Sequence, residues 1–230
     1  MKKYTDFILA LVALVLAVVF AIIVLVYNIN KNGGHIFPVE KIVEKGDTIV
    51  KKKGTLSFSS DDDSVGTIFI GDSRFVGMDK AVDIESNDRE FCVAKVGQGY
   101  VWFKNTALKK IEKIKKDNTS LTSWRYVVCL GVNDLGNIDK YIELYKEITK
   151  EDQNIQLILV SVNPVKNYPS ITNSSIKKFN TKLSDAGYDY IDTFSKMQKE
   201  GFTSTDGLHY DNDTYKKIYS YIKKGLLELE

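Results

Sequence analysis

One serine, one histidine and one aspartate of this chain stand where they could act together in nucleophilic catalysis. Ser73 follows a short apolar run, in the turn Gly71-Asp72-Ser73. A serine nucleophile needs a base to take its proton, and the base needs a partner that holds its imidazole in one tautomer. The chain has two histidines, and His35 lies close behind a long apolar segment near the N-terminus, which leaves His209 as the candidate base. Asp206, three positions before His209, can reach the second ring nitrogen.

Each of these motifs has an ordinary alternative when it is taken alone. Gly-Asp-Ser is common turn composition, and so is the run Gly131-Val132-Asn133-Asp134 farther along the chain. A single histidine before a helix is most simply a surface residue. The combination is more informative, because a nucleophile, a base and an orienting carboxylate all follow apolar runs that are typical of strands.

Five short apolar runs rich in β-branched residues predict the strands that must position these groups. They lie at residues 67–70, 91–96, 126–130, 156–162 and 188–191. Helical spacing of apolar residues occurs at 102–114, 138–149 and 215–226. Strands that alternate with helices predict a parallel sheet covered on both faces. Ligands of open α/β sheets bind outside the carboxyl ends of the strands, which is where the candidate residues stand.

The ordered combination of four blocks resembles the SGNH hydrolases, a branch of the GDSL esterases and lipases. The blocks are Ile70-Gly71-Asp72-Ser73, Val96-Gly97-Gln98-Gly99, Gly131-Val132-Asn133-Asp134 and Asp206-Gly207-Leu208-His209. They occur in the family's order, and the resemblance covers residues 65–230. It implies an α/β, flavodoxin-like three-layer fold with a five-stranded parallel sheet. It also implies hydrolysis or transfer of an ester acyl group through an acyl-enzyme on Ser73, with the triad Ser73, Asp206 and His209, no cofactor and no metal.

The resemblance further implies an oxyanion hole. Its donors would be the backbone N–H groups of Ser73 and Gly97 and the side-chain amide of Asn133. The second block departs from the family pattern, because Lys95 stands where an asparagine is usual, and Gly99 therefore remains an alternative to Gly97. The short separation of Ser73 and Gly97 leaves little room for a lid, so we expect an open site.

Three further residues are candidates for substrate binding. Tyr100 and Tyr210 follow motif residues closely and could stack on a sugar ring, although aromatic residues at such positions more often belong to the core. Arg74 could meet an anionic substrate, or form a surface ion pair instead. Asp72 is expected to stabilise the turn rather than to take part in catalysis.

Composition and charge exclude several other classes of protein. The 230 residues are 43% hydrophobic and 27% charged, which is typical of a folded protein. The net charge is only +2, so a basic nucleic-acid-binding surface is not indicated. Cys92 and Cys129 are too far apart for a Cys-x-x-Cys or zinc-finger motif. If they lie on strands that flank the first strand, they are beyond disulfide reach, and we expect free, buried thiols.

An uncharged segment of 21 residues at 7–27 predicts a transmembrane helix, because such a helix matches the ~30 Å hydrocarbon core. Its length and the lack of an Ala-x-Ala site favour an uncleaved anchor over a signal peptide. Lys2 and Lys3 precede the span and Lys31 follows it, which places residues 1–6 in the cytoplasm. We therefore expect a single-pass plasma-membrane protein, with residues 28–64 as an extracytoplasmic stalk and the domain 65–230 beyond it. Short patches at 48–50 and 55–58 could add strands, which leaves the first ordered residue open.

Three functions remain open on these grounds. The leading hypothesis is an esterase that removes acetyl or other small acyl groups from cell-surface carbohydrate. The second is an O-acetyltransferase, which would need a separate multi-span membrane partner to deliver its acyl donor. The third is a non-catalytic adhesion module, which the fold would permit but which has no need for the combined motifs. A glycosylation sequon at Asn212, three residues from His209, favours a bacterial source, where the sequon is not read.

Overall fold

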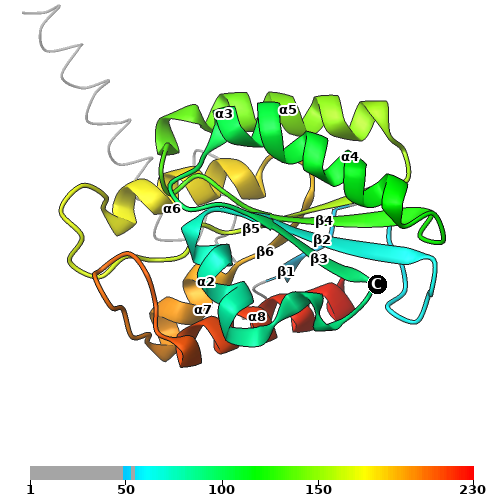
Figure 1. The fold of residues 1–230 in the computed structure, drawn as a ribbon. Helices are drawn as coiled ribbons and strands as arrows, with labels where there is room; N and C mark the ends of the chain where they lie inside the picture. The colour runs from blue at the N-terminus through cyan, green and yellow to red at the C-terminus, as the bar shows by residue number, and fades with distance from the viewer. Residues whose placement is uncertain (1–48, 53–54) are drawn as a thin grey trace, which may run out of the picture. The chain divides into compact units, whose positions relative to one another are not determined.

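The structure, a computed structural model, describes residues 49–52 and 55–230. A sheet of order β1-β6-β5-β4-β2-β3 lies between two layers of helices (Figure 1). Its strands are β1 (Ile49–Val50), β2 (Val65–Gly71), β3 (Glu90–Ala94), β4 (Ser123–Cys129), β5 (Ile155–Val160) and β6 (Asp189–Ile191). Strands β2 to β6 are parallel, which confirms the five predicted strands and the flavodoxin-like order. The predicted strand count is corrected to six, because β1 pairs with β6 in antiparallel orientation.

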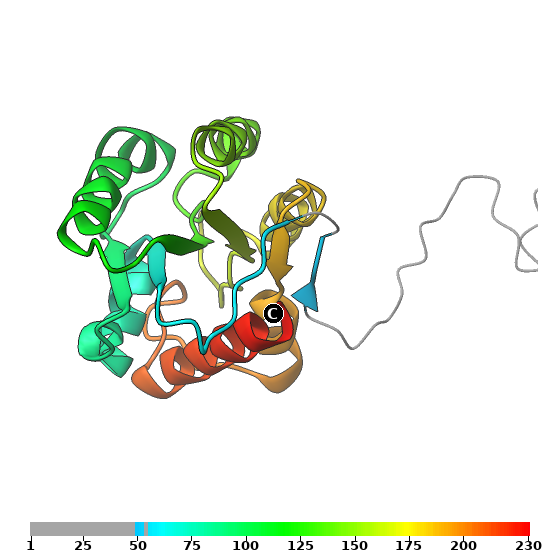
Figure 2. The same cartoon turned by 90° about the vertical axis from the view of Figure 1, so that its right-hand side faces the viewer.

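Helices cover both faces of the sheet, as Figure 2 shows from the side. One layer consists of α2 (Ser73–Val82), α7 (Thr193–Glu200) and α8 (Asn212–Glu228). The other consists of α3 (Tyr100–Trp102), η2 (Phe103–Ala107), α4 (Leu108–Asp117), α5 (Ile138–Glu151) and α6 (Asn173–Ser184). Short 3-10 turns occur at η1 (Ile84–Ser86) and η3 (Leu135–Asn137). The predicted helix at 102–114 is interrupted, since η2 is a turn of π-helix between α3 and α4.

The alternation of side chains along the strands divides the core into two parts. In β2, Ile68 and Ile70 belong to the cluster that packs under α4, α5 and α6, while Phe69 belongs to the cluster under α2 and α8. All three are fully buried. Helix α5 shows the matching helical pattern, because Tyr141 and Tyr145 lie one turn apart and are both buried. This buried sheet holds the carboxyl ends of β2 and β4 in register, where the candidate residues begin.

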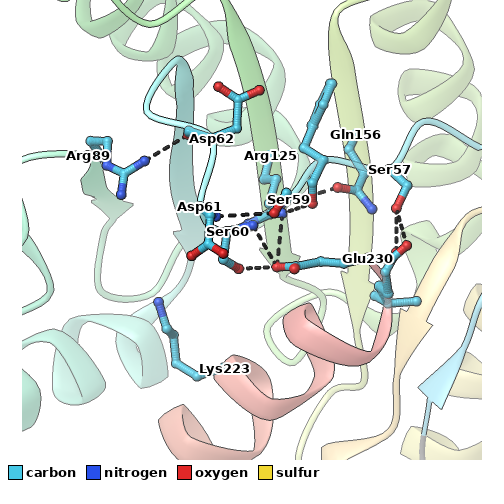
Figure 3. A network of polar contacts seen from close by, with 12 residues as sticks. Ser57, Ser59, Ser60, Asp61, Asp62, Arg89, Arg125, Gln156, Lys223 and Glu230 are labelled. Atoms are coloured by element: carbon cyan, nitrogen blue, oxygen red, sulfur yellow. Dashed lines mark hydrogen bonds and ion pairs between the residues drawn. The ribbon is translucent and has the colours of Figure 1, made fainter.

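Residues 49–52 and 55–64, here called the N-terminal strap, are attached to the domain. The buried carboxylate of Asp189 accepts hydrogen bonds from the Lys52 N–H and the Thr55 hydroxyl, both at 2.9 Å. The buried guanidinium of Arg125 donates to the Phe58 carbonyl. It also lies 3.4 Å from the Glu230 carboxylate, and Figure 3 shows these two side chains together. The strap therefore crosses the edge of the sheet where the parallel strands begin.

These contacts show that part of the segment 28–64, which the sequence indicated as a stalk, belongs to the domain. Its residues 28–48 and 53–54 lie outside the described residues, but the remainder contacts the sheet and the C-terminus. Residues Asp47–Glu230 form one compact unit. The strap is consequently part of the domain, rather than a free tether that ends at Ser64.

The two cysteines are free and lie on β3 and β4, the strands on either side of β2. Cys129 is buried as expected, whereas Cys92 is only half-buried. Burial raises the pKa of Cys92 to about 12, so its thiol is protonated at neutral pH.

The predicted transmembrane segment 7–27 lies outside the described residues. Within 49–52 and 55–230, no helix combines the length and apolar character that crossing a bilayer requires.

Candidate active site

Ser73 occupies the first position of α2, directly after the end of β2. The preceding Asp72 is buried and caps this helix, because its Oδ1 accepts the backbone N–H of Arg74 at 3.0 Å. This is the turn-stabilising role expected of Asp72, and burial raises the pKa of its carboxyl. The strand, the cap and the helix together fix the Ser73 hydroxyl at the carboxyl edge of the sheet.

His209 lies between Ser73 and Asp206. Its Nε2 is 2.8 Å from the Ser73 Oγ, and its Nδ1 is 2.7 Å from the Asp206 Oδ2. The loop that carries both residues is closed by an antiparallel bridge between Ser204 and Tyr210. The structure therefore brings together the three residues that the sequence proposed as a triad, although 136 positions separate Ser73 from His209.

The hydrogen bonds of Asp206 determine which ring nitrogen of His209 carries the proton. Its Oδ1 accepts the backbone N–H groups of Leu208 at 2.8 Å and His209 at 2.7 Å. The backbone N–H of His209, followed by the His209 ring, lowers the pKa of Asp206 to about 2. An ionised carboxylate can only accept, so Nδ1 of His209 carries the ring proton and Nε2 is left to accept from Ser73.

Asn133 and the two candidate glycines lie in the loops that follow β4 and β3, the two strands that flank β2. The Asn133 side chain is exposed, and its amide donates to the Gln98 carbonyl at 2.8 Å. Gly97 has a left-handed φ of +70°, and a Cβ added there would meet open space. A Cβ on Gly99 would instead lie 2.4 Å from the Asp134 carboxylate. Gly99 is thus required for close packing against Asp134, and the left-handed backbone favours glycine at 97. Gly97 stays the proposed second oxyanion donor.

Asp134 has a structural function that the sequence did not reveal. It accepts hydrogen bonds from the Tyr100 backbone N–H and the Tyr141 hydroxyl, both at 2.8 Å, and from the Asn137 amide at 3.0 Å. These bonds tie the loop after β4 to the start of α3. They hold Asn133 next to the loop 97–99. The run Gly131-Val132-Asn133-Asp134 does not predict these hydrogen bonds, because Tyr100 and Tyr141 belong to other elements.

An open pocket of about 570 Å³ lies next to these donors. It is lined by Gly97 and Asn133 together with Lys95, Gln98, Trp102, Asn105 and Thr106, among others. Asn105 and Thr106 belong to the π-helical turn η2 and were not predicted as site residues. Their only signal in the sequence was a helical pattern, which does not show where a π-turn will occur. The pocket offers amide, hydroxyl and ammonium groups, which suit a ligand rich in oxygen atoms.

Two of the three candidate substrate-binding residues are corrected by their burial. Arg74 is 2% exposed and Tyr210 is 3% exposed, so neither is available to a sugar or an anion at the surface. The Tyr210 hydroxyl donates to the Pro164 carbonyl, and its ring packs at 5.5 Å from that of Tyr215. Tyr100 is half-buried, with its ring edge-on to Tyr141 at a centroid distance of 5.6 Å. These side chains stabilise the site from beneath rather than lining it.

The fold is that of solved structures described as SGNH or GDSL proteins. The structure is similar to the C-terminal catalytic domain of peptidoglycan O-acetyltransferase A from Streptococcus pneumoniae, with 20% identity, a TM-score of 0.53, and coverage of 71% of this chain and 93% of that one. It is also similar to a GDSL-like lipase from Parabacteroides merdae, with 13% identity, a TM-score of 0.55, and coverage of 76% and 100%.

A third similar structure is phospholipase A1 from Streptomyces albidoflavus, with 12% identity, a TM-score of 0.51, and coverage of 70% of this chain and 98% of that one. No protein-family model and no curated protein matches the chain. At these identities the likeness establishes the SGNH/GDSL hydrolase fold, while activity and substrate have to be argued from the site itself.

Proposed function

We propose that this protein is a serine esterase that removes acetyl or other small acyl groups from carbohydrate at the outer face of the cell membrane. The observation that carries the proposal is the continuous chain of contacts from the Ser73 Oγ through His209 to Asp206, at 2.8 and 2.7 Å. Distances of this size fall in the range needed for proton transfer between a nucleophile and its base. A polar pocket lined by Gly97 and Asn133, the other proposed oxyanion donors, supports the proposal further.

The proposed reaction proceeds in two halves. The Ser73 Oγ attacks the ester carbonyl carbon while His209 Nε2 takes the hydroxyl proton, and Asp206 stabilises the imidazolium that results. The negative charge on the carbonyl oxygen is received by the N–H groups of Ser73 and Gly97 and by the Asn133 amide. The C–O bond to the alcohol then breaks, and the alcohol leaves with the proton from His209. Water repeats the sequence on the acyl-serine and releases the carboxylic acid and free Ser73.

Carbohydrate is the proposed substrate because of the character of the pocket. Gln98, Asn105 and Thr106 provide amide and hydroxyl groups, while Lys95 adds one cation. Hydroxyl-rich ligands are bound through such groups, whereas a long acyl chain needs a largely apolar pocket. The same polarity leads us to expect a short acyl group.

An O-acetyltransferase is the second candidate, and the similarity to the peptidoglycan O-acetyltransferase domain favours it. In that case a sugar hydroxyl would replace water in the second half of the reaction. The open pocket lined by Gly97 and Asn133 offers room for such an acceptor. A separate multi-span membrane protein would have to supply the acyl donor.

The membrane anchor is the proposed function of residues 7–27. An anchor would hold the enzyme close to a substrate that is itself fixed at the cell surface. The proposal rests on the uncharged length of this segment and on the lysines that precede it.

Hydrolysis of aryl esters by the full-length chain tests the esterase. Aryl acetate should be cleaved faster than aryl butyrate or octanoate, and Ser73→Ala should remove the activity. The matched control is Ser120→Ala, which changes an exposed serine between α4 and β4. Acyl transfer to an added glycan that exceeds hydrolysis would identify the transferase instead. An inert wild-type protein that still binds a cell-wall polymer would replace both enzymes with the adhesion module.

A further inference from the structure

Arg74 connects the helix that begins with Ser73 to the loop that carries His209. Its Nε–H donates to the Leu208 carbonyl at 3.1 Å. Its guanidinium carbon lies 5.3 Å from the centre of the Tyr210 ring, within the range of a cation–π contact. Leu208 and Tyr210 are the two neighbours of His209 in the chain. One buried side chain thus holds both flanks of the candidate base.

The same guanidinium also reaches the segment that follows β5. Its Nη1–H donates to the Asn163 carbonyl at 2.7 Å. The next residue, Pro164, accepts the Tyr210 hydroxyl through its carbonyl, and Lys166 donates its N–H to the Gly207 carbonyl at 2.9 Å. The segment 163–166 therefore forms a support for the His209 loop, and Arg74 binds to the loop and to its support together.

The remaining hydrogen bonds of the loop define its shape but not its position on α2. The His209 carbonyl accepts from the Thr205 N–H at 2.9 Å and from the Ser204 hydroxyl at 2.7 Å, and both donors belong to the loop itself. Among the residues that the structure describes, the hydrogen bonds between this loop and α2 are the Arg74–Leu208 bond and the Ser73–His209 bond. The second of these is the bond that changes during the reaction, so the first is the direct hydrogen bond to α2 that persists. The loop is also bonded to α8, because the Thr203 N–H donates to the Thr214 hydroxyl at 3.2 Å and the Tyr210 N–H donates to the Tyr215 hydroxyl at 3.3 Å.

An arginine suits this task because of its shape. The planar guanidinium directs donors to two carbonyls in different directions and also stacks on an aromatic face. A lysine would preserve the charge, but its single ammonium cannot reproduce the fork or the stacking. A methionine would fill the space without donating any hydrogen bond.

We infer that Arg74 is a positioning residue, which holds the His209 loop on α2 so that Nε2 stays within hydrogen-bond distance of the Ser73 Oγ. The inference rests on the proposed function, in which His209 is the base for Ser73. A displacement of about 1 Å at a reacting pair can cost on the order of 100-fold in rate. The contacts of Arg74 should therefore affect turnover more than substrate binding.

The kinetic test compares Arg74→Lys and Arg74→Met with wild type in the full-length chain, well below the melting temperature of each protein. We expect kcat for aryl acetate to fall about 10- to 100-fold, with KM within about twofold. The matched control is Arg125→Lys, a second buried arginine that binds a distant backbone carbonyl, but at the opposite edge of the sheet (Figure 3). This control should lower the melting temperature and leave kcat unchanged.

Hydrogen exchange provides a readout that does not depend on activity. Backbone amides of residues 203–211 should exchange faster in both Arg74 variants, while in Arg125→Lys the faster exchange should be confined to the strap. Wild-type exchange at 203–211 together with kcat within twofold of wild type in Arg74→Lys would overturn the inference. If the wild-type protein cleaves no ester, the proposed function fails, and the exchange result alone decides whether Arg74 positions the loop.

Discussion

The imidazole of His209 has a different partner on each ring nitrogen, and this asymmetry is the chemical centre of the molecule. Asp206 is tied by two backbone N–H groups within its own loop, so its carboxylate is held toward Nδ1 at 2.7 Å. Ser73 approaches Nε2 from α2, a separate element. The carboxylate is thus positioned locally, and the nucleophile is positioned by the tertiary fold.

The first prediction at this scale concerns the pH range in which Asp206 stays charged. Its pKa in the folded state is lowered from 3.8 to about 2, so the ionised form stabilises the fold above pH ~4, and this contribution is lost as the pH falls toward 2. Carbon NMR of labelled aspartate should show one carboxyl that titrates near pH 2. Acid loss of activity above pH 4 should therefore not follow this carboxyl, and a titration near pH 4 would contradict the geometry.

Replacing Asp206 by asparagine tests the same contact through turnover. The amide can present a donor to Nδ1 and favour the wrong tautomer, so kcat should fall about 10³- to 10⁴-fold at every pH between 5 and 8. The melting temperature should also fall, because the backbone N–H groups of Leu208 and His209 lose a charged acceptor, so kcat is measured well below it. A variant with nearly normal kcat would exclude a role for Asp206 in orienting His209.

The second prediction concerns Asn133. Loss of one oxyanion donor typically costs ~10² to 10³ in kcat, and Asn133→Ala should show a loss of this size with little change in stability because the side chain is exposed. Asn154→Ala is the matched control, since Asn154 is also exposed but precedes β5 at the opposite edge. Steady-state kinetics and thermal melts of both variants provide the measurement. Equal kcat in the two variants would remove Asn133 from the oxyanion hole.

At the scale of elements, the strap is the least expected part of the fold. It adds β1 to the sheet and supplies partners for buried polar groups at the starts of β4 and β6. Asp189 is fully buried and Arg125 is 5% exposed, so each would be costly to leave without its partners. We therefore expect the segment before Val65 to stabilise the folded domain.

Truncation tests this conclusion directly. A chain that begins at residue 65 should melt about 4 to 24 °C below one that begins at Asp47, because each of the two buried polar groups left without its strap partner costs ~1 to 3 kcal/mol and each kcal/mol is worth about 2 to 4 °C in a domain of this size. Calorimetry of the two chains provides the comparison. Equal melting temperatures would show that the strap contributes little to the folded state.

At the scale of the whole molecule, the two edges of the sheet have separate tasks. The carboxyl edge carries the triad, Asn133 and the pocket, while the amino edge binds the strap and the C-terminal Glu230. The parallel strands between them are buried and rigid, so the two edges can be altered independently. This separation allows attachment at one end and chemistry at the other.

Removal of residues 1–46 tests the separation. A chain that begins at Asp47 should leave the membrane fraction of expressing cells, while its kcat for a soluble aryl acetate should stay within about threefold of the full-length value, because the triad and the strap are both retained. Fractionation and kinetics are the two measurements. A full-length chain found entirely in the soluble fraction would contradict the proposed anchor.

The sequence by itself determined the five parallel strands and the motifs at their ends. Strand patterns and turn residues are local signals, and right-handed βαβ connections leave few ways to assemble them, so Ser73 and Asn133 had to lie at one edge. The Asp206–His209 contact is also local, since three positions separate the two residues.

Only the tertiary structure decided which side chains are covered. The sequence leaves Arg74 as a surface candidate, and leaves Tyr210 open between a sugar platform and the core, because hydrogen-bond partners of both are distant in the chain. Their partners Leu208, Asn163 and Pro164 come from segments 134, 89 and 46 positions away. The start of the domain stayed open in the sequence for the same reason, since the partners of the strap belong to β4, β6 and the last residue of the chain. Burial depends on contacts between segments that are distant in the chain. The residue pattern of one segment therefore cannot predict which of its side chains are buried.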